Sequence, residues 1–267
     1  MSIFLALRTL EEENQAAALC TVIESQGSTP RHTGSKMLVY PDGRLVGTVG
    51  GGELENRVIA EALQSIKDGL ARRLSYQMAD PQRGDPGVCG GQVEVYVEPI
   101  LPKPTLVLIG AGHVGKAVAH LASWVGFRVV VNDDRPGFCT PEVVPGADEY
   151  YPIPMAQLPE KIEINPWTYL VLTTRGMNVD VEGLPELLKF QPAYIGLIGS
   201  KRRWQSTRKK LLELGMDAET LDRIRSPIGL ELHAETPEEI AVSILAEIIM
   251  IRNGGDGRSM SSLPGRK

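Results

Sequence analysis

Three glycines near the middle of the chain have the spacing of a turn that binds a nucleotide phosphate. Gly110, Gly112 and Gly115 follow a short apolar run at 106–109 and open a stretch with helical periodicity. In this context the first glycine permits a tight turn, the second lets the backbone approach a pyrophosphate, and the third allows a helix to pack closely on a strand. The free N–H groups at the helix start then bind the phosphates.

Two further residues accompany this glycine turn. Asp133 follows a second apolar run at 128–131, about 20 residues further on, where a carboxylate can accept hydrogen bonds from a ribose hydroxyl. His113 lies within the turn and is a candidate contact for a bound cofactor, although a solvent-facing or packing role is the simpler interpretation of a single histidine. The order of strand, turn, helix, strand and acid predicts a Rossmann-like fold and indicates a nucleotide site.

A different chemistry is indicated at Cys89, which stands between an irregular loop and the pair Gly90 and Gly91. A thiol beside unencumbered amides and nearby arginines has a lowered pKa, and its thiolate is both a nucleophile and a ligand for soft metals. An incidental loop cysteine explains the residue equally well. The other two cysteines are predicted to be structural, because Cys20 lies in an apolar strand pattern and Cys139 in an ordinary loop.

A run of three glycines, Gly50, Gly51 and Gly52, opens another predicted helix. Such a run exposes several backbone N–H groups and forms an anion site in principle. A turn that needs positive φ explains one or two glycines but not three. Because the polar residues at 28–31 come shortly before in the chain, we predict a ligand-facing loop here.

A basic cluster follows the last predicted strand of the second half, where Ser200 and Lys201 begin a helix that continues with Arg202 and Arg203. Positive charges in a first helical turn oppose the helix dipole, so three of them cost stability unless an anion lies nearby. Ligands of open α/β sheets bind at the carboxyl ends of the strands. We predict a phosphate-binding edge at this position, while a basic surface turn is the simpler explanation for any single residue.

The pattern of apolar runs divides the chain into two domains. Residues 1–98 mix helical and alternating patterns and predict an α+β domain, and the proline-rich run at 99–104 predicts a linker. Residues 105–253 predict a Rossmann-like, doubly wound parallel sheet, followed by a flexible tail at 254–267. The fold class is therefore α/β, with strands of the second domain expected near 105–109, 128–132, 168–173 and 193–198.

Composition narrows the classes of function. The chain has 267 residues, 42% of them hydrophobic, and a net charge of −5, which disfavours a surface for nucleic acid or anionic membranes. No apolar run reaches the length of a membrane span, and the start of the chain lacks the features of a signal peptide. Three cysteines without a C-x-x-C pair suit the reducing cytoplasm. The long apolar helix predicted at 238–251 favours a homodimer.

Taken together, these motifs resemble the XdhC/CoxI family, the accessory factors of xanthine dehydrogenase and carbon monoxide dehydrogenase. The resemblance implies an N-terminal domain of the XdhC/CoxI type followed by the Rossmann-like domain. The matching segments run in the family order over nearly the whole chain, at 27–31, 47–55, 89–95, 110–115, 198–201, 227–230 and 236–241.

The resemblance implies a function in cofactor maturation rather than ordinary catalysis. Family members bind the molybdenum cofactor (molybdopterin), protect it, help it gain its terminal sulfido ligand and deliver it to a molybdenum hydroxylase. The implied partners are an apo-hydroxylase of the xanthine dehydrogenase type and a cysteine desulfurase. On this basis the Cys89 thiolate ligates molybdenum or relays sulfur, and Lys201 with the glycine-rich helix starts holds the cofactor phosphate. We expect Cys89 to lie near the Gly112 turn in a cleft between the domains.

The chain departs from the family pattern at one place. Many members carry His-Asp after the strand that ends here at Thr173, whereas this chain has Thr174 and Arg175. Asp180 is retained. The role of the His-Asp pair does not transfer to this chain, and the identity of the hydroxylase that it serves is left open.

Two other classes of function fit the glycine fingerprint. An NAD(P)-dependent oxidoreductase would use the turn and Asp133 to bind its cofactor, and a nucleotide-sensing regulator would use them without chemistry. The bound nucleotide would be NAD(P) or, in a cofactor carrier, the nucleotide of an extended pterin. The sequence shows no C-terminal substrate domain and no Ser-Tyr-Lys or histidine-based set for hydride transfer, which disfavours the oxidoreductase.

Overall fold

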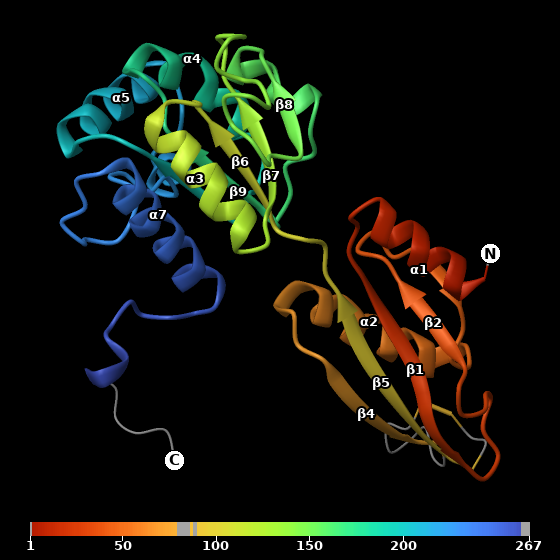
Figure 1. Cartoon of the computed structure of the whole chain (residues 1–267). Coiled ribbons are helices and arrows are strands. Elements are labelled where there is room, and N and C mark those ends of the chain that lie inside the picture. The colour runs from red at the N-terminus through yellow and green to blue at the C-terminus, as the bar shows by residue number, and fades with distance from the viewer. Residues whose placement is uncertain (1, 79–85, 88–89, 263–267) are drawn as a thin grey trace. The chain divides into compact units, whose positions relative to one another are not determined.

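The computed structural model describes residues 2–78, 86–87 and 90–262 of the chain. They form two compact units, Met1–Pro102 and Lys103–Lys267, each with its own five-stranded sheet (Figure 1). Cys89, the predicted molybdenum ligand, lies outside the described residues.

The first unit is built on an antiparallel sheet in the order β3-β2-β1-β5-β4. Strand β1 is central and pairs with both β2 and β5. Helix α2 lies behind β1 and β5 in Figure 1, and α1 buries Ala6 and Leu10 against Leu38 and Tyr40. The elements are α1 (Ile3–Glu12), β1 (Ala17–Gln26), β2 (Lys36–Val39), β3 (Leu45–Gly47), α2 (Gly52–Asp68), β4 (Arg72–Gln77) and β5 (Gln92–Ile100).

The second unit begins with β6 (Thr105–Ile109), and its sheet is parallel throughout in the order β10-β9-β6-β7-β8. Successive residues of a strand face opposite sides of the sheet. Leu106 and Leu108 therefore join one core, and Val107 and Ile109 join another. The other elements are α3 (His113–Trp124), β7 (Arg128–Asn132), β8 (Glu149–Tyr151), η2 (Met155–Glu160), β9 (Thr168–Leu172), α4 (Met177–Leu187), β10 (Tyr194–Leu197), α5 (Lys201–Glu213), α6 (Ala218–Asp222), α7 (Pro237–Arg252) and η3 (Met260–Ser262).

The two cores of this unit lie on opposite faces of the sheet. The first core contains side chains of α3 and α7, and the second contains side chains of η2, α4, α5 and α6. A parallel sheet with helices on both faces is the doubly wound arrangement. The predicted α/β class and Rossmann-like second domain are therefore confirmed.

Two elements differ from the prediction. Strand β8 was not expected, because its three residues are only half-buried and form no apolar run. Strand β5 continues through Pro99 to Ile100, so the proline-rich run begins inside a strand rather than in a linker. Pro99 is tolerated there because β4 pairs with β5 only as far as Val97, which leaves the end of β5 paired on one side.

Helix α3 meets β6 at a contact that admits no side chain. A methyl group added to Gly115 would lie 2.1 Å from the Gly110 carbonyl oxygen and 3.0 Å from Thr173 Oγ1. We expect Gly115→Ala to lower the free energy of unfolding by about 1–3 kcal/mol through overpacking, even though alanine is otherwise favoured in a helix by about 1 kcal/mol. Urea denaturation followed by circular dichroism measures this difference.

The matched control is Gly137→Ala in a loop of the same unit. No described atom lies within 4 Å of a methyl group added to Gly137. Equal stability of the two variants would contradict the close contact between α3 and β6.

Candidate functional site

Three loops that contain predicted site residues meet at one end of the first unit. A methyl group on Gly91 would lie 2.3 Å from the Ser28 carbonyl oxygen and 2.7 Å from that of Gln26. A methyl group on Gly50 would lie 3.0 Å from Cγ of Pro30. The loop at 27–31 thus contacts both the glycine run at 50–52 and the segment that follows Cys89, and a side chain at Gly91 would collide with it.

The glycine run at 50–52 already binds an anion, which belongs to the chain itself. The Glu55 carboxylate accepts hydrogen bonds from the N–H groups of Val49 and Gly51, both at 3.2 Å, and from the Thr48 hydroxyl. The Gly50 N–H donates to Thr48 Oγ1 at 3.2 Å. This role of Glu55 was not predicted from the sequence, although an acidic residue in the first turn of a helix favours such a contact.

The cysteines of the described residues are both buried. Burial raises the pKa of the Cys20 thiol to about 12. Burial also raises the pKa of Cys139, whose Sγ donates to the Val131 carbonyl oxygen at 3.3 Å. Both thiols are therefore protonated at neutral pH, in agreement with the structural roles predicted for them.

The glycine turn of the second unit has the geometry of a phosphate-binding turn. Gly110 adopts φ = 104°, and a methyl group there would lie 2.6 Å from the Thr173 carbonyl oxygen. Gly112 is the N-cap of α3 with no side-chain cap, and no described atom lies within 4 Å of a methyl group added to it. The start of α3 therefore lacks a side-chain cap and has room beside Gly112, and an uncapped helix start of this kind can bind a phosphate. His113 is exposed next to Gly112.

The Asp133 carboxylate is occupied by hydrogen bonds from other residues of the chain. Its carboxylate accepts from the Ala111 N–H at 2.8 Å and from the backbone N–H, Nε and Nη2 of Arg135 at 3.0, 2.8 and 2.8 Å. Burial acts to raise the pKa of Asp133, but these hydrogen bonds outweigh it and lower the pKa below its usual value. A carboxylate accepts about four hydrogen bonds, so the predicted ribose contact would require Arg135 to move.

The basic cluster after β10 is divided between the interior and the surface. Arg203 turns inward, and its Nη2 donates to Asp180 Oδ2 at 2.6 Å and to Thr174 Oγ1 at 2.7 Å. Asp180 is fully buried, so the anion near this helix start is a side chain. Ser200 caps α5 by accepting the Arg203 N–H at 3.2 Å. Lys201 is exposed, and no hydrogen bond or ion pair joins its side chain to the described part of the chain.

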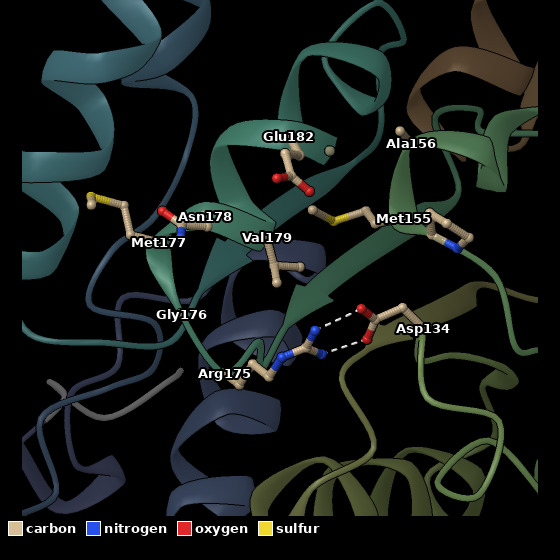
Figure 2. A pocket seen from close by; sticks show the side chains of 11 residues that line it. Asp134, Met155, Ala156, Arg175, Gly176, Met177, Asn178, Val179 and Glu182 are labelled. Atoms are coloured by element: carbon tan, nitrogen blue, oxygen red, sulfur yellow. Dashed lines mark hydrogen bonds and ion pairs between the residues drawn. The ribbon is translucent and has the colours of Figure 1, made fainter.

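A cavity of about 580 Å³ lies beside the carboxyl ends of β7 and β9 (Figure 2). Arg175 and Asp134 form a double hydrogen bond at its edge, at 2.5 and 2.7 Å. This pair raises the pKa of Arg175 and lowers that of Asp134. A narrower hollow lined by Gly110, Asp133 and Arg175 adjoins it. The larger cavity is lined by Asp134, Pro154, Met155, Ala156, Arg175, Gly176, Met177, Asn178, Val179, Glu182 and Gly183.

The sequence predicted Thr174 and Arg175 at a strand end but did not predict the cavity. Its lining comes from three separate segments, namely the end of β7, η2 and α4. The available signal was the departure from the family pattern at Arg175.

Among the residues that the structure describes, no group of three His, Cys, Asp or Glu side chains could hold a metal ion. None of the helices in the described ranges has the length and hydrophobicity of a membrane span.

The arrangement defines a Rossmann-type protein with a phosphate turn and an adjoining cavity, and comparison with known proteins identifies its family. The family described as the XdhC Rossmann domain matches residues 106–248, and the XdhC and CoxI family matches residues 10–77. The chain belongs to the XdhC family, as the sequence motifs indicated.

Three relatives resemble the chain over most of its length. It is 37% identical over 97% of its length to uncharacterized protein YqeB of Escherichia coli K12, but it spans only 48% of that relative. It is 27% identical to a probable xanthine dehydrogenase subunit of Bacillus subtilis 168, over 92% of this chain and 96% of the relative. It is 25% identical to the molybdenum cofactor insertion chaperone PaoD of E. coli K12, over 89% and 84%.

A solved structure is also similar over the whole chain. The crystal structure of a xanthine dehydrogenase from Bacillus halodurans matches with a TM-score of 0.51 and 27% identity. The match covers 99% of this chain and 98% of the other.

Substitutions of Arg203 and Lys201 are expected to differ strongly in their effect on the free energy of unfolding. Replacing Arg203 with methionine leaves the Asp180 carboxylate buried without its partner, so we expect Arg203→Met to lower the free energy of unfolding by about 3–5 kcal/mol. Lys201→Met removes an exposed charge and should change it by less than about 0.5 kcal/mol. Urea denaturation of both variants measures the difference. Equal effects of the two substitutions would show that Arg203 does not have the structural role seen here.

Proposed function

We propose that this chain binds the molybdenum cofactor, protects it, supports its sulfuration and delivers it to a molybdenum hydroxylase of the xanthine dehydrogenase type. The observation that supports this most strongly is membership of the XdhC family, together with similarity to a relative named as a molybdenum cofactor insertion chaperone. The proposed partners are the apo-hydroxylase and a cysteine desulfurase that supplies the sulfur.

In this proposal Cys89 is the residue that meets molybdenum. Its neighbours Gly90 and Gly91 lie at the meeting point of three loops, where Gly91 contacts the loop at 27–31 so closely that a side chain would not fit. The proposed role of the Cys89 thiolate is to ligate the molybdenum or to relay sulfur to it, since soft metals prefer thiolate ligands. Cys20 and Cys139 are unsuited to either task because both are buried as thiols.

The phosphate of the cofactor is assigned to the second unit. The uncapped start of α3 at Gly112 and the exposed Lys201 both follow carboxyl ends of parallel strands, and therefore lie at the same edge of the sheet. N–H groups and an ammonium group are suited to a phosphate or to the pyrophosphate of a nucleotide-extended pterin.

A second candidate function is NAD(P) binding, in an oxidoreductase or a nucleotide sensor. The intact turn from Gly110 to Gly115 favours it. The engagement of the Asp133 carboxylate by Ala111 and Arg135 is unfavourable, because that carboxylate is the usual acceptor for the ribose of NAD.

We also propose that the protein is a cytoplasmic homodimer. Helix α7 is apolar on nearly all sides, and Val242 on its surface is 49% exposed. A dimer contact would cover such a residue.

Cofactor loading tests the proposed function. We expect purified protein incubated with molybdenum cofactor to retain about one molybdenum and one pterin per chain, and we expect Cys89→Ala to lose affinity by at least about tenfold, or ~1.4 kcal/mol. Mass spectrometry measures molybdenum, and fluorescence after oxidation measures the pterin.

The control for this experiment is Cys139→Ala, which removes a buried thiol and should leave loading unchanged. If Cys89→Ala retains the same amounts of molybdenum and pterin, Cys89 is not a molybdenum ligand and its proposed role is sulfur relay alone. Absence of loading in the unsubstituted protein would overturn the carrier function.

A further inference from the structure

Two exposed polar side chains of α4 line the cavity beside the glycine turn, and one of them, Glu182, acts electrostatically on Arg175. Asn178 and Glu182 are four residues apart, so they lie on the same side of the helix, and both line the cavity. No hydrogen bond or ion pair joins either side chain to another of the described residues. Figure 2 shows the Glu182 carboxylate on the side of α4 that faces Met155.

The rest of the lining supplies apolar contact and one positive group. Met155 and Val179 extend into the space between α4 and the end of β7 (Figure 2). Arg175 is held by Asp134, and its side chain is half-exposed at the edge. A volume of about 580 Å³, lined by apolar side chains together with a few polar groups, is within the range of sites for small molecules.

The hydrogen-bonding groups that line the cavity determine which heterocycle can bind there. A carboxylate only accepts hydrogen bonds, so Glu182 matches a ring edge that presents two adjacent donors. The 2-amino-4-oxopyrimidine ring of a pterin, and the equivalent ring of guanine, presents a ring N–H beside an exocyclic amine. Adenine presents an amine beside an acceptor nitrogen, whose lone pair a carboxylate repels.

We propose that this cavity binds the 2-amino-4-oxopyrimidine edge of a pterin or of a guanine nucleotide. Glu182 accepts from the ring N–H and the amine, and the Asn178 amide donates to the oxo group. The phosphate lies toward Gly112, away from the negative charges of Glu182 and Asp134. The pterin source rests on the proposed function, because the molybdenum cofactor contains a pterin, whereas the guanine source does not.

Titration calorimetry of the full chain with GMP, AMP and 6-carboxypterin tests this assignment. We expect GMP, 6-carboxypterin or both to bind, and AMP to bind at least about tenfold more weakly. Glu182→Gln should weaken the binding of GMP and 6-carboxypterin by about 10- to 100-fold. Glutamine presents one acceptor and one donor, which matches adenine, so the ratio of GMP to AMP affinity should fall. A loss of fold would weaken all three ligands alike.

The matched control is Glu186→Gln, one turn further along α4. Glu186 pairs with Lys189 at 2.6 Å and is absent from the cavity lining. This substitution should leave all three affinities unchanged.

The outcomes separate the two sources and the two proposals. Binding of GMP but not of 6-carboxypterin identifies a guanine nucleotide as the ligand, and the reverse identifies the pterin. AMP binding as tight as that of GMP, unchanged affinities in Glu182→Gln, or no binding of any probe overturns the assignment. Molybdenum loading of Glu182→Gln and of the unsubstituted chain tests the proposed carrier function independently of the cavity. If Glu182→Gln and the unsubstituted chain both load molybdenum but GMP and 6-carboxypterin do not bind, the protein carries the cofactor without using this cavity.

Discussion

The functional edge of the second unit depends on backbone contacts that only glycine allows. A side chain on Gly115 would collide with the Gly110 carbonyl, and one on Gly110 would collide with the Thr173 carbonyl. The Thr173 hydroxyl donates to the Gly110 carbonyl oxygen and closes the same contact. These approaches bring β6, α3 and β9 together at one point of the sheet, so the start of α3 opens beside the loop that carries Arg175 and leads into α4.

Ion pairs distinguish two kinds of polar group at this edge of the sheet. Some are paired within the protein, and others remain available to bind a ligand. Asp133 is engaged by Arg135, Asp180 by Arg203, and Asp134 by Arg175. Asp133 and Asp180 are nearly or fully buried, so an unpaired carboxylate there would be costly. Lys201, Asn178 and Glu182 make no such contacts within the described structure. The first unit shows a similar arrangement, since the Glu55 carboxylate accepts hydrogen bonds from the N–H groups of Val49 and Gly51 at its own glycine run.

The features that sequence predicted are those that depend on residue type and short-range spacing. The glycines at 110, 112 and 115 could be assigned from their spacing, and a side chain at 110 or 115 would collide with a backbone carbonyl. The apolar runs predicted four of the five parallel strands. The inward turn of Arg203 could not be predicted, because its partners Asp180 and Thr174 are more than 20 residues away in the chain. The cavity was missed for the same reason, since Asp134, Met155 and Glu182 come from three segments.

The identity of the natural ligand tests this account most directly. Native mass spectrometry of the intact chain, purified from cells that make the molybdenum cofactor, would weigh whatever the protein carries. We expect a bound species with the isotope pattern of molybdenum and the mass of the pterin cofactor, lost on unfolding. A bound NAD(P) in its place, or unliganded chain alone, would contradict the account of this protein as a carrier of the molybdenum cofactor.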